Sequence, residues 1–92
     1  MSILNGDQLY SWLLEQETEG DDDRRFYSSY LLGHVSLSIA DTEEDPSHFE
    51  ATLNHSVDEA LAIDKLTEQD IQGIRDLLAQ GINLSITHTS MA

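Results

Sequence analysis

The chain has 92 residues, which suffices for one domain and leaves no room for a second hydrophobic core. It contains no cysteine, so disulfide frameworks, thiolate nucleophiles and cysteine-ligated metal centres are excluded. Eighteen acidic residues against four basic ones give a net charge of −14, which repels nucleic-acid phosphates and anionic membrane surfaces. We therefore expect a small acidic domain that contacts neither nucleic acid nor membrane directly.

The opening stretch "MSILNGDQLYSW" lacks the basic segment and the long apolar segment of a secretory signal. No apolar run approaches the roughly 20 residues that span a bilayer. We expect a cytoplasmic protein.

The first predicted helix begins near Ser2 or Asp7 and ends at Thr18. Apolar side chains recur within it at helical spacing. Gly20 follows two residues later, and glycine is the residue type that commonly terminates a helix.

The second predicted helix covers residues 22–43. Asp21, Asp22 and Asp23 offer carboxylates that cap its start and complement the positive end of its dipole. The stretch "HVSLSIA" also alternates as a strand would, but it lies in a long run without proline, and helix is favoured. One predicted apolar face comprises Phe26, Tyr30, Gly33, Leu37 and Ala40, and the opposite face comprises Leu31, Leu32, Val35 and Ile39. With both faces apolar, this helix should lie at the centre of the fold.

The third predicted helix begins with a capping box, in which Ser47 follows Pro46 and Glu50 stands three residues further on. Its apolar stripe consists of Phe49, Leu53, Val57, Ala60 and Leu61.

The fourth predicted helix begins with a variant capping box of Thr67 and Asp70 and ends at Gly81. Its apolar stripe consists of Ile71, Ile74, Leu77 and Leu78. Residues 82–92 are predicted to be a flexible, poorly ordered tail. The alternation of apolar residues in "INLSITH", together with that in "HVSLSIA", leaves open a two-stranded pairing in an α+β fold, although helix is favoured for the earlier stretch.

Four amphipathic helices joined by short connections predict an all-α fold, a small antiparallel four-helix bundle. The bundle should occupy residues 1–81 as a single domain, with residues 82–92 as the C-terminal tail.

Gly33 and His34 interrupt the apolar run of the second helix. Glycine costs about 1 kcal/mol relative to alanine inside a helix, so we predict that Gly33 admits the close approach of a neighbouring helix. His34 is interpreted as a partly buried imidazole held by a tyrosine, such as Tyr30, or by a serine. The alternative is a ligand-binding or pH-sensitive residue near Asp41.

The stretch "SSYLLGHVSLSIADTE" resembles the central segment of the YfcL-like family of small bacterial proteins of unknown function. In that family a Tyr-Leu-x-Gly-His core leads into an apolar helix and an acidic residue. The residues that carry the resemblance are Tyr30, Leu31, Gly33, His34, Ile39 and Ala40. The helix pattern extends the resemblance over most of the chain except the tail. It implies an all-α fold in the bacterial cytoplasm and implies no activity.

The residues that could suggest a metal site or an enzyme lack the spacing or the residue types that such a site requires. His48 and His55 stand two helical turns apart, about 10 Å, which is too far to share an ion. His55 with Glu59 is typical of a solvated helix face. The stretch "DTEEDPSHFEAT" has proline and threonine where a calcium loop needs glycine and glutamate. We predict no catalytic residue, no metal ligand and no cofactor.

The acidic residues are the strongest functional indication. We predict a non-catalytic protein–protein interaction module that binds a basic partner or mimics nucleic acid. Its expected interaction surface is Asp21, Asp22, Asp23, Glu43, Glu44 and Asp45. The alternative function is binding of a divalent cation or small ligand through the acidic loops or near His34. We expect a monomer or a weak homodimer, the latter through Trp12 and the two-sided second helix.

Overall fold

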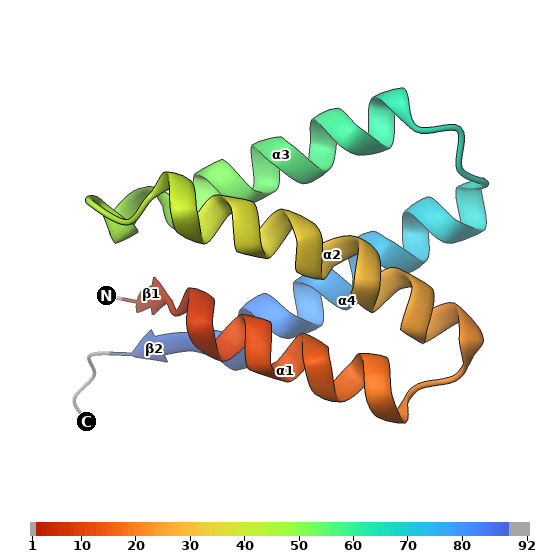
Figure 1. Cartoon of the computed structure of the whole chain (residues 1–92), viewed down its shortest axis with the longest axis horizontal. Helices are drawn as coiled ribbons and strands as arrows, with labels where there is room; N and C mark the ends of the chain where they lie inside the picture. Colours follow the sequence, from red (N-terminus) through yellow and green to blue (C-terminus); the bar gives the residue numbers. More distant parts are fainter. Residues whose placement is uncertain (1, 89–92) are drawn as a thin grey trace.

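The computed structural model describes residues 2–88, and the side chains of residues 4–85 (Figure 1). Its elements in chain order are β1 (Ser2–Leu4), α1 (Gly6–Glu19), α2 (Asp22–Asp41), the 3-10 turn η1 (Pro46–His48), α3 (Phe49–Ile63), α4 (Glu68–Ser85) and β2 (Ile86–His88). The predicted all-α bundle of four helices is confirmed.

The central helix is α2, as predicted, because α1, α3 and α4 all pack against it (Figure 1). Its buried stripe alternates steps of three and four residues through Ser28, Leu31, Val35 and Ser38, and continues to Thr42, which directly follows the helix. The other helices supply Leu9, Leu13, Phe49, Leu53, Val57, Leu61, Ile74, Leu77 and Leu78 to the core.

One of the two apolar faces predicted for α2 is wrong. Leu31, Leu32 and Val35 are buried as expected, but Phe26 is 44% exposed and Leu37 is 63% exposed. The buried face instead includes serine, and the Ser28 hydroxyl meets its hydrogen-bonding need by donating to the Arg24 carbonyl (2.7 Å). A residue of low hydrophobicity can therefore occupy the inner face.

Side-chain caps begin three of the helices. The cap oxygen belongs to Asn5 for α1, Asp21 for α2 and Thr67 for α4, and each accepts from the backbone N–H three residues on (3.0, 2.9 and 3.1 Å). The predicted cap at Asp21 is thus confirmed. Of the variant capping box predicted for Thr67 and Asp70, the Thr67 cap is confirmed, whereas the Asp70 carboxylate accepts from the Tyr27 hydroxyl.

The capping box predicted at Ser47 is wrong. Pro46–His48 form the turn η1, and α3 begins only at Phe49, without a side-chain cap. The Ser47 hydroxyl donates to the Asp45 carboxylate, so its oxygen is engaged outside the helix.

The end predicted for α4 at Gly81 is also wrong. The helix continues through this buried glycine to Ser85, and β2 then pairs antiparallel with β1, Leu4 lying opposite Ile86. The strand left open for "INLSITH" is present only over Ile86–His88, and its partner is β1 rather than "HVSLSIA", which is helical. Residues 82–88 belong to α4 and β2 rather than to a tail, and residues 89–92 lie outside the described residues.

Close helix approach occurs at Gly73 and Gly81, not at Gly33. A Cβ atom at Gly81 would lie 2.6 Å from Leu9 Cδ1 and 3.0 Å from the Trp12 ring, and one at Gly73 would meet the Tyr27 ring. A Cβ atom at Gly33 would meet no atom within 4 Å. The packing role predicted for Gly33 is wrong because this residue lies on the exposed face of α2.

We predict opposite effects of alanine at these two helical glycines. Gly33→Ala should stabilise the fold by about 0.5–1 kcal/mol, since it removes backbone freedom from the unfolded chain and adds no clash. Gly81→Ala removes the same backbone freedom from the unfolded chain, but its methyl group overpacks the contact between α1 and α4. This overpacking should lower the free energy of unfolding by about 1–3 kcal/mol. The difference between the two variants in urea unfolding, followed by circular dichroism, isolates this steric cost. Equal unfolding midpoints would contradict the close approach at Gly81.

Candidate functional site

The structure separates the two acidic clusters predicted to form an interaction surface. Asp21–Asp23 stand at the start of α2, whereas Glu43–Asp45 follow its end. A helix of 20 residues holds these two points about 30 Å apart. The clusters are therefore two surfaces at opposite ends of the bundle rather than one.

The end that carries Asp21–Asp23 also carries cationic side chains, and we call it the mixed end. It is formed by the connections between α1 and α2 and between α3 and α4 (Figure 1). Arg24 and Arg25 follow the acidic cluster directly, and Lys65 lies in the other connection. Arg24 is also held in place, because its Nε donates to Gln16 Oε1 (2.7 Å). The carboxylates there are partly compensated.

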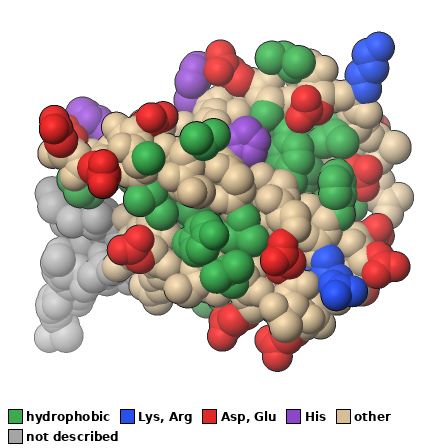
Figure 2. All heavy atoms as spheres, viewed as in Figure 1, with side chains coloured by type: hydrophobic (Ala, Val, Ile, Leu, Met, Phe, Trp, Pro, Cys, Tyr) green, Lys and Arg blue, Asp and Glu red, His purple; other side chains and the backbone are tan. Residues whose placement is uncertain are grey.

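The opposite end carries acidic residues without lysine or arginine, and we call it the acidic end. It is formed by the start of α1, the end of α2, the connection to α3 and the end of α4 (Figure 1). Its exposed carboxylates are Asp7, Asp41, Glu43, Glu44, Asp45 and Glu50. The four Lys and Arg residues of the whole chain are Arg24, Arg25, Lys65 and Arg75. None of these four belongs to the segments of the acidic end, and on the face in Figure 2 the basic side chains lie toward the mixed end.

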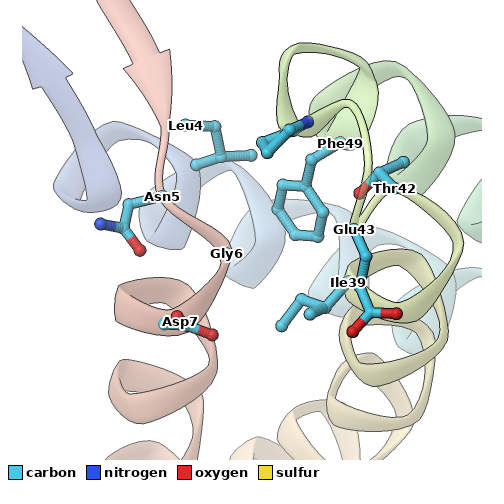
Figure 3. A pocket seen from close by; sticks show the side chains of 9 residues that line it. Leu4, Asn5, Gly6, Asp7, Ile39, Thr42, Glu43 and Phe49 are labelled. Atoms are coloured by element: carbon cyan, nitrogen blue, oxygen red, sulfur yellow. The ribbon is translucent and has the colours of Figure 1, made fainter.

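An apolar pocket of about 430 Å³ opens at the acidic end (Figure 3). Leu4, Ile39 and Phe49 point into it from β1, α2 and α3. Phe49 is buried, and its ring lies close to the backbone of Gly6, where a Cβ atom would come within 3.1 Å of Phe49 Cζ. Glycine at this position lets the first turn of α1 approach the ring.

Carboxylates flank this pocket on two sides. Asp7 lies in the first turn of α1 and Glu43 in the turn that follows α2, and both contribute to the pocket wall (Figure 3). Nearby, the hydrogen bond from the Ser47 hydroxyl, with the proximity of His48, lowers the pKa of Asp45 below its ordinary value. Asp45 therefore keeps its negative charge to a lower pH than a free aspartate.

His34 is half-buried and holds α2 to α3. Its Nδ1 lies 2.8 Å from Ser56 Oγ, and its ring centroid lies 5.1 Å from that of Tyr30. The sequence predicted a serine or tyrosine partner, and the serine comes from the neighbouring helix. Asp41, proposed as the partner in a functional site, is exposed and lies about two helical turns further along α2.

Within the described part of the chain, no three His, Asp or Glu side chains are grouped so that they could hold a metal ion. His55 Nε2 lies 3.5 Å from Glu59 Oε2 in an exposed pair on α3. His48 Nδ1 lies 2.8 Å from Asp45 Oδ2. The geometry thus offers the cation-binding alternative no cluster of ligands among these residues.

Two tyrosines of α2 bind carboxylates near the start of α4. The Tyr30 hydroxyl donates to Asp64 (2.8 Å) and the Tyr27 hydroxyl donates to Asp70 (3.0 Å). Burial, and then the hydrogen bond to Asp64, raise the pKa of Tyr30 to about 12. Burial and the bond to Asp70 likewise raise the pKa of Tyr27.

The fold and this site define a class: a small all-α bundle with an apolar pocket at an end that carries exposed carboxylates and no lysine or arginine. The family model described as YfcL protein matches residues 6–82, and the chain belongs to this family. No curated protein and no solved structure matches the chain. Among the described residues, no helix is both long and apolar enough to cross a bilayer.

Sequence reasoning missed the pocket. Phe49 and Ile39 were assigned to apolar faces, but nothing in their spacing shows that a cavity remains between them. Asn5 before Gly6 is a recognisable helix start, and it would have placed Asp7 in the first turn of α1. The convergence of three elements at one end depends on the tertiary fold.

We predict that the fold loses stability at alkaline pH through these tyrosines. A raised folded-state pKa means that the stabilising contribution is fully present below about pH 10, the unfolded pKa of tyrosine, and is lost as pH rises toward 12. Urea unfolding at pH 8 and at pH 11 should show this loss. The double variant Tyr27→Phe/Tyr30→Phe should be less stable at pH 8 and lose less between the two pH values. An unchanged loss in the double variant would contradict this assignment.

Proposed function

We propose that this protein is a non-catalytic interaction module that binds a basic segment of another protein at the acidic end. The observation that carries the proposal is the concentration there of six exposed carboxylates on segments that contain no lysine or arginine. A surface of one charge sign steers a partner of the opposite sign and speeds its association.

The negative field at this end comes from side chains. The helices α2 and α4 end there without a basic residue in the last turn, while α1 and α3 begin there. The negative and positive ends of these helix dipoles largely offset one another. Asp7 and Glu50, in the first turns of α1 and α3, add negative charge beside the two positive ends.

The cluster Asp21–Asp23 contributes less in this proposal. Asp21 accepts the hydrogen bond that caps α2, and Arg24 and Arg25 lie beside the cluster. Arg25 Nη1 lies 4.0 Å from Asp22 Oδ1.

Mimicry of nucleic acid is the less favoured form of the interaction. A mimic needs carboxylates that follow a strand of phosphates, whereas α2 separates the two clusters by about 30 Å. Local docking of a basic segment needs only one end. We place the protein in the bacterial cytoplasm, as a monomer or a weak homodimer that would associate through Trp12 and α2.

We predict that neutralising the two clusters has unequal effects on binding of a basic probe. Glu43→Gln/Glu44→Gln/Asp45→Asn should weaken binding of a fluorescein-labelled decalysine peptide, mainly through a slower association rate. The matched control Asp21→Asn/Asp22→Asn/Asp23→Asn removes the same charge at the mixed end and should weaken it less. Stopped-flow fluorescence at several salt concentrations measures both rates.

Salt separates this proposal from a simpler role of the acids in solubility. Association with the unsubstituted protein should slow steeply as ionic strength rises, because exposed charges are screened over about 8 Å at physiological salt. Equal rates for the two triple variants, or rates indifferent to salt, would mean that the acidic end recruits no basic partner.

A further inference from the structure

We propose that the apolar pocket at the acidic end holds a large aliphatic or aromatic side chain of a partner segment, with lysine or arginine on either side of it. This inference rests on the proposed function and names the motif that the acidic end would recognise.

The pocket has the size and lining of a binding site. Its volume of about 430 Å³ lies in the range of ligand sites, roughly 300–1,000 Å³. The side chains of Leu4, Ile39 and Phe49 face it, and Ile39 is only partly buried in the isolated chain (Figure 3). An apolar side chain placed there would cover apolar surface that is otherwise exposed to water.

Charge decides which apolar group fits. Asp7 and Glu43 flank the opening from different helices, and Glu44 and Asp45 continue the acidic connection. An anionic ligand would be repelled at this rim, and an uncharged one would leave the carboxylates without partners. Cationic residues on both sides of the inserted side chain would meet Asp7 and Glu43.

A second hollow and an exposed apolar surface fit a partner less well. A cleft of about 260 Å³ at the mixed end is lined by Asp21, Asp23 and Asp76 but also by Arg24, whose guanidinium donates to the Gln80 side-chain oxygen (3.3 Å). The exposed residues Phe26 and Leu37 form a convex helix face, and no feature of the structure shows what would cover it.

Three labelled peptides test the inference on the unsubstituted protein: acetyl-KKLKK-amide, acetyl-KKAKK-amide and acetyl-SSLSS-amide. Fluorescence anisotropy should show KKLKK binding about tenfold or more tightly than KKAKK, since leucine buries more apolar area than alanine. The uncharged SSLSS should bind about tenfold or more weakly than KKLKK, because it offers no cation to the rim.

Charge variants locate the binding. Asp7→Asn/Glu43→Gln should weaken KKLKK about fivefold or more, since both carboxylates border the pocket. The matched control Asp22→Asn/Asp23→Asn, with the same change in charge at the mixed end, should change it less than about twofold. All four positions are exposed, so neither variant should disturb the core.

The outcomes separate this inference from the proposed function. KKLKK and KKAKK could bind with equal affinity, and salt and Asp7→Asn/Glu43→Gln could weaken both. This result would contradict insertion of an apolar side chain into the pocket but would agree with binding of a basic partner at the acidic end. Failure of both lysine peptides to bind overturns both. Tight binding of SSLSS overturns the requirement for flanking cations. A dimer in sedimentation that Ile39→Ala abolishes would identify a second copy as the occupant and overturn the partner motif.

Discussion

The buried stripe of α2 is the constraint on which the rest of the structure depends. The helices α1, α3 and α4 all pack against α2, and α3 packs mainly against it. Ser28 and Ser38 are fully buried on the inner face of α2, while Leu31 and Val35 fill its centre. Once this stripe is buried, the face with Phe26 and Leu37 is exposed, and the two acidic clusters lie at opposite ends of the molecule.

The pocket follows from how the chain is held at the acidic end. The strand β1 pairs with β2, and the Asn5 N–H donates to the Ser85 carbonyl (3.0 Å), which fixes the residues just before α1. Leu4 is thereby kept beside Phe49, and Gly6 allows α1 to begin against the ring. The apolar wall and the carboxylates of Asp7 and Glu43 come from elements distant in sequence. The apolar wall of the pocket and these two carboxylates thus lie together at the acidic end.

The features that the sequence predicted correctly are local. The caps at Asp21 and Thr67 depend on a hydrogen bond to a backbone N–H three residues on, and such bonds form largely independently of tertiary packing. The stripe of α3 is wholly apolar, so its spacing alone orients that helix. Prediction failed for α2 because its inner face contains serines and its outer face contains Phe26. It failed at Gly81 because a glycine that ends a helix and one that admits a neighbouring helix have the same sequence signature. The pocket could not be predicted because spacing along one helix does not reveal the shape left between three elements.

The central claim is that apolar and charged recognition coincide at the acidic end. Isotope-filtered nuclear Overhauser spectroscopy of the labelled protein with unlabelled KKLKK peptide tests it most directly, because it reports which protein protons lie within about 5 Å of the leucine methyl groups. We expect contacts from those methyl groups to the Phe49 ring and to the methyl groups of Leu4 and Ile39. Contacts to Phe26 or Leu37 on the exposed face of α2, with none to Phe49 and Ile39, would contradict the account.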